Sequence, residues 1–397
     1  MSSNKAWVVG VGMVPFKKPG ASEPYDAMGA QAARQALADA GVDYQSVQQA
    51  YAGFVYGDST SGQQALYGVG LTGIPIINVN NACATGSTAL FLARQAVESG
   101  AVEVALALGF EQMNPGALGV TYNDRPSIMG RQLALARETV SWREDVPMAA
   151  LLFGSAGEEH QRKYGTSAEA FARVSVKARE HASRNPLAIF RDKLSLEEVM
   201  ASKTIYGPLT RFQCCPPTCG AAAAVIVSAD YARRHGLAGQ AVEVVAQAMT
   251  TDPQATLEGH SMMRVVGVEM ARNAARQVYE SAGIGPAEVD VCELHDCFTT
   301  NELLTYESLG LAPEGGGEKF VMDGDNTYGG QVVTNPSGGL LSKGHPLGAT
   351  GLAQCAELTW QLRGQAEARQ VEGARVALQH NLGLGGACVV TMYRKAA

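Results

Sequence analysis

The sequence predicts an α/β fold made of two similar halves. Charged residues are only 17% of the 397 residues, while glycine is plentiful, a composition that suits a compact α/β protein. A helix–turn–strand pattern around Ala40-Gly41 recurs around Ala282-Gly283, at an offset of 242 residues. Ala-Thr-Gly also opens a helical pattern in both halves, at 84–86 and 349–351. Each half should therefore hold a mixed sheet covered by helices.

The order of elements follows from the hydrophobic pattern. In the first half a helix ends at Gly41, since glycine readily takes the left-handed conformation of a helix C-terminus, and a strand enters the core after Val47. The second half repeats this order around Gly283. Further strands are expected, from their apolar runs, at 73–79, 102–110 and 374–386.

Between the halves lies a segment without the repeat, 113–225. It carries 14 Lys and Arg against 11 Asp and Glu, whereas the remainder of the chain carries 17 against 27. The local excess of positive charge suits an anionic ligand, although a mixed solvated surface explains it about equally well. The sequence therefore predicts domains at 1–112, 113–225 and 226–397, with a helix over 168–185 and a core strand in "GAAAAVIVSA".

Charge and composition argue against several classes of function. A net charge of −7 without a basic tail disfavours nucleic acid, and no apolar run reaches the roughly 18 residues of a membrane span. The first residues lack the features of a secretory signal, so the eight cysteines should be reduced thiols in the cytoplasm. We expect no metal and no permanently bound cofactor, because "QCCPPTCG" lacks a second cysteine pair and no phosphate-loop or dinucleotide motif is present.

Cys83 is the first candidate for chemistry. It lies between a predicted strand and the helix that opens with Ala-Thr-Gly. Free N–H groups and the dipole at a helix N-terminus stabilise a thiolate, so this position favours a nucleophile. The alternative is a buried structural cysteine.

His345 is the second candidate, in a Gly- and Pro-rich loop just before the second Ala-Thr-Gly helix. If the halves are related by a pseudo-twofold axis, the two helix N-termini meet and the imidazole approaches the thiol of Cys83. A lone loop histidine is otherwise usually an exposed surface residue. The glycine turn in "NLGLGGACVV" is either a backbone donor to an oxyanion or a plain tight turn.

Together these motifs resemble those of the thiolases, and most closely the sterol-carrier-protein-x type of 3-ketoacyl-CoA thiolase. The match is strongest from about Gln161 to Tyr393 and includes "FQCCPPTCGAAAA", "ELHDCFTTNELLTYESLGL", "NPSGGLLSKGHPLGATG" and "VALQHNLGLGG". The resemblance implies a thiolase fold of two βαβαβαββ halves, with 113–225 as a loop domain that covers coenzyme A. It also implies assembly as at least a dimer.

The resemblance further implies an acyltransferase reaction in lipid metabolism or β-oxidation, the cleavage of a 3-oxoacyl-CoA by the co-substrate CoA. Cys83 is then the nucleophile that becomes acylated. His345 takes the thiol proton and also helps to bind the thioester oxygen. The backbone N–H groups of Cys83 and Gly383 should hold the tetrahedral adduct, while the CoA-binding residues of the insert stay unassigned.

The chain departs from ordinary thiolases in two places, at Asn381 and at "HDCF" (295–298). Ordinary thiolases place the second acid/base cysteine where this chain has Asn381, and carry Asn-Glu-Ala-Phe in place of "HDCF". The sterol-carrier-protein-x pattern implies that Cys297 is the second acid/base and that His295 replaces the asparagine in the oxyanion hole. Asp296 should be structural, because neighbouring residues of a strand point to opposite faces.

Other readings stay open on the sequence alone. One is a thiolase-like protein that binds acyl-CoA or lipid without catalysis, and another is a condensing or aldolase-type enzyme on the same fold. The acyl chain of the substrate is expected to be medium or long, and 2-methyl-branched or sterol-derived. The released product would be acetyl-CoA or propanoyl-CoA. The protein is expected to be a stand-alone bacterial cytoplasmic enzyme. Cys388 should be a core residue, and Cys219 stands where relatives are expected to have an acidic residue, with no consequence assigned.

Overall fold

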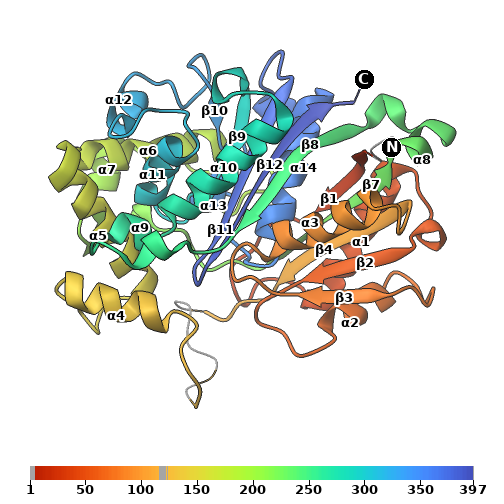
Figure 1. The fold of residues 1–397 in the computed structure, drawn as a ribbon, viewed down its shortest axis with the longest axis horizontal. Coiled ribbons are helices and arrows are strands. Elements are labelled where there is room, and N and C mark those ends of the chain that lie inside the picture. Colours follow the sequence, from red (N-terminus) through yellow and green to blue (C-terminus); the bar gives the residue numbers. More distant parts are fainter. Residues whose placement is uncertain (1–4, 116–121, 123, 397) are drawn as a thin grey trace.

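A computed structural model describes residues 5–115, 122 and 124–396. Its centre is a ten-stranded mixed sheet with the order β10-β9-β11-β12-β8-β1-β7-β4-β2-β3 (Figure 1). The strands of the first half are β1 (Ala6–Met13), β2 (Gln49–Gly53), β3 (Ile76–Val79), β4 (Val104–Glu111) and β7 (Gly220–Ser228). Those of the second half are β8 (Val242–Thr250), β9 (Val291–Glu293), β10 (Val333–Thr334), β11 (Val376–Gly383) and β12 (Ala387–Lys395).

The two halves of the sheet have the same topology. Numbered in chain order within each half, the five strands lie in the spatial order 3-2-4-5-1 in both. In the first half β2 is parallel to β3 and β4, while β7 is antiparallel to β4 and β1. In the second half β9 is parallel to β10 and β11, while β12 is antiparallel to β11 and β8. The predicted fold class of two βαβαβαββ halves is therefore confirmed.

The repeated glycines end equivalent helices. Helix α1 (Tyr25–Ala40) stops at Gly41 and α10 (Val268–Ala282) stops at Gly283, whose φ angles are 65° and 64°. Only glycine takes this left-handed conformation without strain, so the chain turns here toward β2 and β9. Helix α1 packs on β1 and β7, and α10 packs on β8 and β12.

The two helices that open with Ala-Thr-Gly pack against each other. Helices α3 (Thr85–Glu98) and α14 (Thr350–Arg363) share one apolar cluster with strands of both halves. Gly86 and Gly351 permit this approach, because a Cβ on Gly86 would lie 2.7 Å from the carbonyl oxygen of Gly348 and one on Gly351 would lie 2.2 Å from Ser87 Oγ. The predicted meeting of the two helix N-termini is therefore observed.

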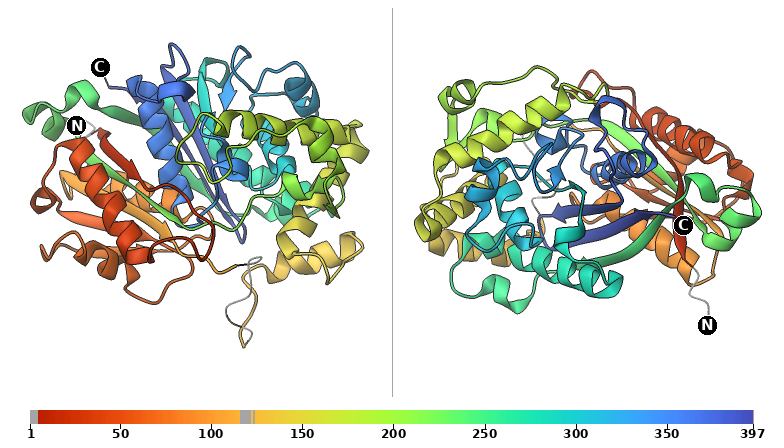
Figure 2. Two further views of the ribbon diagram at one scale, coloured as in Figure 1. Left: turned by 180° about the vertical axis from the view of Figure 1, so that it is seen from behind. Right: turned by 90° about the horizontal axis from the view of Figure 1, so that it is seen from above.

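The inserted segment lies against the second half of the protein, away from β2 and β3 (Figure 2). Its helix α5 (Met148–Tyr164) packs on α9 (Met262–Val265) of the second half. Its helix α6 (Ala168–Ala182) packs on three further helices of that half, α11 (Thr299–Ser308), α12 (Gly317–Met322) and α13 (Gly339–Ser342). Helix α6 is the one expected over 168–185, and the Ser167 side chain caps it by accepting the Ala170 N–H. The elements of the insert are α4 (Gly130–Thr139), α5 (Met148–Tyr164), α6 (Ala168–Ala182), α7 (Leu196–Ala201), β5 (Thr204–Tyr206) and β6 (Leu209–Thr210).

The expected boundary between 225 and 226 needs correction. It falls inside β7, whose residues pair with β1 on one side and β4 on the other, so this strand belongs to the first half. The apolar run of β7 was recognised as a core strand, but its pairing depends on strands more than 100 residues earlier. We place the end of the insert just before β7. The expected domain ranges also include 1–4, 116–121, 123 and 397, which lie outside the described residues.

The remaining helices are short or cover the outside of the sheet. None of the described helices is both long and apolar enough to cross a membrane. Their bounds are α2 (Ser61–Tyr67), α8 (Ala229–Arg234), α9 (Met262–Val265), α11 (Thr299–Ser308), α12 (Gly317–Met322) and α13 (Gly339–Ser342).

Candidate active site

Three loops that are distant in the sequence meet the end of β11 where α3 and α14 begin. Cys83 follows β3 and directly precedes the first residues of α3. His295 and Cys297 follow β9, and His345 lies between α13 and α14. Gly383 is the last residue of β11. The carboxyl ends of strands in open α/β sheets are the usual place for such a gathering of polar residues.

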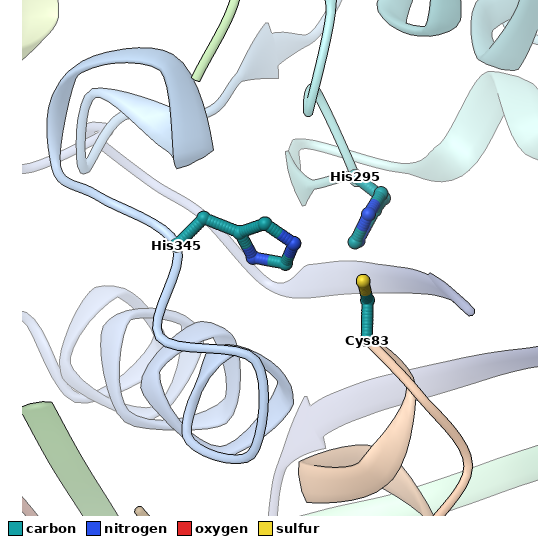
Figure 3. Close-up of side chains that lie close together, drawn as sticks. All are labelled: Cys83, His295 and His345. Atoms are coloured by element: carbon teal, nitrogen blue, oxygen red, sulfur yellow. The ribbon is translucent and has the colours of Figure 1, made fainter. Parts of the chain in front are cut away.

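The structure brings Cys83, His295 and His345 together. The sulfur of Cys83 and one ring nitrogen of each histidine all lie within 4.8 Å of one another. The two imidazole rings meet edge to face, with centroids 4.9 Å apart and an angle of 85° between the planes. Figure 3 shows the thiol of Cys83 directed toward both rings. The three side chains come from three different loops and both halves of the protein.

The hydrogen bonds of His345 define its tautomer. Its Nδ1 lies 2.8 Å from Thr350 Oγ1, and the Thr350 hydroxyl donates to the carbonyl oxygen of Pro346 at 2.9 Å. Because that hydroxyl hydrogen is already used, Thr350 Oγ1 accepts from Nδ1–H, and Nε2 keeps its lone pair. Burial lowers the pKa of His345 to about 3. His345 is therefore a neutral imidazole with a free basic nitrogen.

Cys83 differs from the expectation of a stabilised thiolate. Burial of the sulfur, followed by the nearby Glu111 carboxylate, raises the pKa of Cys83 to about 12. Cys83 also lies ahead of Ala84, the N-cap residue of α3, so the effect of the helix N-terminus is outweighed. The preceding Ala82 has a φ of 48°, which is uncommon for a residue with a side chain and produces the sharp turn before Cys83. The resting group is thus a thiol.

Cys297 lies in the same region as a second buried thiol, only 6% exposed. Burial, followed by the neighbouring Cys215, Cys83 and Asp296, raises the pKa of Cys297 well above the usual range of a thiol. It therefore carries a proton at neutral pH and becomes a strong base once that proton is lost.

The segment "QCCPPTCG" contacts the site, which the sequence did not suggest. The Cys215 N–H donates to the carbonyl oxygen of Cys297 at 2.9 Å, and Pro217 pairs with His345 in an isolated β-bridge. Cys215 is thus a further thiol beside Cys297. A residue before proline favours an extended backbone, the only local signal that this segment could run beside another strand.

Asp296 connects the "HDCF" loop with the loop of His345. Its buried carboxylate accepts the N–H groups of Leu340 at 2.7 Å and Leu341 at 3.3 Å, at the start of α13. Gly339 gives the carboxylate room, since a Cβ there would lie 2.1 Å from Asp296 Oδ2. These contacts agree with the structural role expected for Asp296.

Gly383 and Asn381 bring the end of β11 against the Cys83 loop. A Cβ on Gly383 would lie 2.3 Å from the carbonyl oxygen of Asn81 and 3.1 Å from the N atom of Ala84, so only glycine fits there. The side-chain amide nitrogen of Asn381 lies 3.0 Å from the carbonyl oxygen of Cys83 and 3.1 Å from His295 Nδ1. The sequence identified Asn381 only as the residue that replaces a cysteine, with no signal of these contacts.

The other two cysteines considered from the sequence lie in the core. Cys388 lies fully buried on β12 opposite Leu382, as predicted for a core residue. Cys219 is also fully buried, and its sulfur accepts the Met113 N–H at 3.2 Å. Cys219 therefore ties the start of β7 to the chain that leaves β4.

Glu111 is a buried carboxyl group that the sequence did not identify. It accepts N–H groups from Tyr56 at 2.9 Å, from Gly348 at 3.0 Å and from Val55 at 3.0 Å. It thereby joins the end of β4 to the loop after β2 and to the loop of His345. Burial, only partly offset by these hydrogen bonds, raises the pKa of Glu111 to about 7.

The raised pKa of Glu111 predicts a pH-dependent stability. The folded protein holds the proton more tightly than the unfolded chain, so this group's contribution to stability is present at pH 4.5 and is lost as the pH rises through 7. We expect the melting temperature of the wild type to fall over this range relative to that of Glu111→Gln, by an amount equivalent to about 3 kcal/mol. Thermal unfolding of both proteins between pH 4.5 and 8 measures the difference, and parallel curves would contradict the prediction.

Two family models cover most of the chain. One described as "Thiolase, N-terminal domain" matches residues 6–230, and one described as "Thiolase C-terminal domain-like" matches residues 253–393. The chain belongs to the thiolase family. Sterol carrier protein 2 of Rattus norvegicus is 55% identical over 393 residues, which are 98% of this chain and 72% of that protein. The expected resemblance to the sterol-carrier-protein type is thereby confirmed.

A second relative and two solved structures agree with this assignment. The acetyl-CoA acetyltransferase of Methanothermobacter thermautotrophicus is 36% identical, covering 91% of this chain and 92% of that protein. The solved structure of an "Ltp2-ChsH2(DUF35) aldolase" superimposes with a TM-score of 0.82 at 23% identity, covering 99% of this chain and 98% of that one. The structure of human mitochondrial 3-ketoacyl-CoA thiolase in complex with CoA superimposes with a TM-score of 0.74 at 19% identity, covering 99% of this chain and 98% of that one. At these identities the structures establish the fold alone.

Proposed function

We propose that the protein is a 3-oxoacyl-CoA thiolase that cleaves its substrate with CoA through an acyl-cysteine intermediate. The observation that carries this proposal is the meeting of the Cys83 thiol with two neutral imidazoles within 4.8 Å, beside the second buried thiol of Cys297. The same three atoms are spaced closely enough to hold a metal ion. The proposed reaction does not use a metal ion, because it needs each of these groups for proton transfer, nucleophilic attack or hydrogen bonding.

The first half of the proposed reaction acylates Cys83. Nε2 of His345 takes the thiol proton as the sulfur attacks the 3-keto carbon, so no resting thiolate is needed. The backbone N–H groups of Cys83 and Gly383 hold the oxyanion of the tetrahedral adduct. The C2–C3 bond then breaks, and its electron pair forms an enolate on the departing acyl-CoA. His295 and the protonated His345 stabilise the thioester oxygen, and Cys297 protonates C2.

The second half transfers the acyl group to CoA. The Cys297 thiolate removes the proton from the incoming CoA thiol, which attacks the acyl-Cys83 carbonyl carbon. The Cys83–acyl bond breaks, and the leaving sulfur recovers its proton from His345. The shortened acyl-CoA departs with Cys83 and Cys297 both protonated, as at the start. Run backward, the same steps make a Claisen condensation.

CoA is proposed as co-substrate, with no permanently bound cofactor. The insert carries a positive balance, 14 basic against 11 acidic residues over 113–225, and packs beside the loops that hold the site. These features support its proposed role of covering CoA, whose phosphates are anionic.

A direct assay tests the proposal. The purified protein is mixed with 3-oxoacyl-CoA thioesters of increasing chain length, straight or 2-methyl-branched, and loss of the enolate absorbance is followed with and without free CoA. We expect loss that depends on CoA, with products shortened by acetyl or propanoyl units. Absence of CoA-dependent loss for every substrate would contradict the proposal. That result would favour lipid binding or an aldolase-type reaction. One of the superimposed structures is named as an aldolase.

We also propose that the protein works as a homodimer. Strand β3 is an outer strand of the sheet and pairs only with β2 among the described strands. An unpaired strand edge invites pairing with another chain, and Tyr67 and Leu71 near it are 54% and 78% exposed. Light scattering should give about twice the 41.7 kDa of one chain. Leu71→Asp should shift the mass toward the monomer, whereas Met322→Asp, at a 45% exposed position on α12, should not. A monomeric wild type would contradict the proposal.

The proposed compartment is the bacterial cytoplasm, and the proposed pathway is the degradation of fatty-acyl, branched or sterol side chains. All eight cysteines are free thiols, including those near one another at the site. A reducing environment keeps such thiols available for chemistry, which supports this placement.

A further inference from the structure

Asn381 is a fully buried residue on β11 that contacts two groups of the site at once. Its amide nitrogen donates to the carbonyl oxygen of Cys83 at 3.0 Å and lies 3.1 Å from His295 Nδ1. Its amide oxygen accepts the hydroxyl of Ser87 at 2.8 Å. An asparagine amide has two N–H donors, so both are used here, one on each neighbour.

A chain of buried hydrogen bonds fixes which way this amide points. Ser87 Oγ accepts from Gln379 Nε2 at 2.8 Å, so its own hydrogen is left for the oxygen of Asn381. Gln379 Nε2 also donates to the carbonyl oxygen of Gly351 at 2.7 Å, and the hydroxyl of Tyr393 donates to Gln379 Oε1. Turning the Asn381 amide over would set its oxygen against the carbonyl oxygen of Cys83, two acceptors with no hydrogen between them.

The orientation of the amide determines the tautomer of His295. An N–H group directed at Nδ1 requires that this nitrogen carry no proton. Burial, followed by the nearby His345 and His380, lowers the pKa of His295 well below its usual range, so the ring is neutral. The single ring proton must therefore reside on Nε2. His345 has the opposite arrangement, with its proton on Nδ1 and a lone pair on Nε2.

We propose that Asn381 is a positioning residue that sets the tautomer of His295, so that His295 offers an N–H donor while His345 offers a basic nitrogen in the same site. The same amide holds the carbonyl oxygen of Cys83, which fixes the nucleophile's loop against the ring of His295. The proposal rests on the proposed thiolase function only for its effect on rate. The tautomer itself is a property of the free protein.

The first test observes the tautomer directly. Full-length protein labelled with ¹⁵N-histidine is studied by NMR, and the signals of His295 are assigned by their loss in His295→Gln. The wild type should show a bare Nδ1 and a protonated Nε2. At pH 8, where the introduced carboxyl group of Asn381→Asp is ionised and can only accept, Nδ1 should become protonated. Asn78→Asp serves as a matched control, since it makes the same change on β3 and keeps the oxygen that accepts the Gly62 N–H.

The second test uses the pH dependence of turnover. At neutral pH, Asn381→Asp should lower kcat on the order of 10²-fold, because the neutral ring loses its Nε2–H donor. At lower pH the ring becomes doubly protonated beside the carboxylate and regains that donor. The ratio of the kcat of Asn381→Asp to that of the wild type should therefore fall as the pH rises through the pKa that His295 has in the variant. A purely structural defect would lower this ratio equally at every pH.

These outcomes separate the inference from the proposed reaction. A wild-type His295 protonated on Nδ1, or an Asn381→Asp protein with a bare Nδ1, would overturn the positioning role. The predicted tautomers without any thiolysis would leave the positioning role in place and remove the proposed function. If Asn381→Asp does not fold, Asn381→Ala takes its place. That change removes the N–H donor at Nδ1, so it should give a mixture of both His295 tautomers, and an unchanged spectrum would contradict the proposal.

Discussion

Replacing Cys83 with alanine is expected to abolish thiolysis. The substitution removes the only group proposed to form the covalent intermediate, and loss of the nucleophile in a covalent enzyme lowers kcat on the order of 10⁶-fold. The fold should be retained, because Cys83 is only partly buried and alanine fits the same space. Steady-state turnover of a 3-oxoacyl-CoA, measured beside the thermal unfolding of both proteins, checks the two parts of this prediction.

Trapping the intermediate tests the same assignment from the opposite direction. Wild-type protein given a 3-oxoacyl-CoA without free CoA should gain the mass of the shortened acyl group on the peptide that contains Cys83. Cys388→Ala, which alters a core thiol on β12, should acylate normally and serves as a control. An acyl group found on Cys215 or Cys297 in place of Cys83 would contradict the assignment. The mass of the trapped group also identifies the side chain of the substrate.

Replacing Cys297 with alanine is expected to separate the two halves of the reaction. Acylation of Cys83 should still be detectable in a single turnover, since His345 remains to take the thiol proton. Steady-state turnover should fall by about 10²–10⁴-fold, because nothing then protonates the enolate or deprotonates CoA efficiently. Rapid-quench measurement of acyl-Cys83 alongside the overall rate distinguishes these two effects.

Cys215 provides a demanding control for that experiment. It lies beside Cys297, and its backbone N–H donates a hydrogen bond to the carbonyl oxygen of Cys297. Burial raises the pKa of Cys215, as it does that of Cys297. Cys215→Ala should keep most of the wild-type turnover if Cys297 alone is the second acid/base. Full activity in Cys297→Ala would remove the two-thiol assignment, and a severe loss in Cys215→Ala with normal Cys297→Ala turnover would move the role to Cys215.

The fold could be predicted because its signals are local and occur twice. Gly41 and Gly283 end equivalent helices, and Ala-Thr-Gly opens equivalent ones, so the sequence displays the duplication without any knowledge of contacts. The expected boundary between residues 225 and 226 was wrong, because the apolar pattern of β7 identifies a strand but not the strands with which it pairs. Register and pairing between distant strands depend on packing across the whole sheet.

The site could be predicted in part for the same reason. The position of Cys83 and His345 beside equivalent helices placed them together, and the structure does bring them within 4.8 Å. The contacts of Asn381, Glu111 and Cys215 were not predicted, because each depends on a pairing across loops that no short motif records. The high pKa of Cys83 was missed as well. Burial cannot be judged from a helix N-terminus alone.

The close contact between helices α3 and α14, at Gly86 and Gly351, has a consequence for folding. Cys83 lies just before α3 in the first half and His345 lies just before α14 in the second, so neither half carries a complete set of reacting groups. Each half can gain its own secondary structure early, yet the nucleophile and its base meet only when the helices dock without a side chain between them. During refolding from denaturant, recovery of activity should therefore lag behind recovery of the circular dichroism signal. The return of turnover reports the final docking of the two halves.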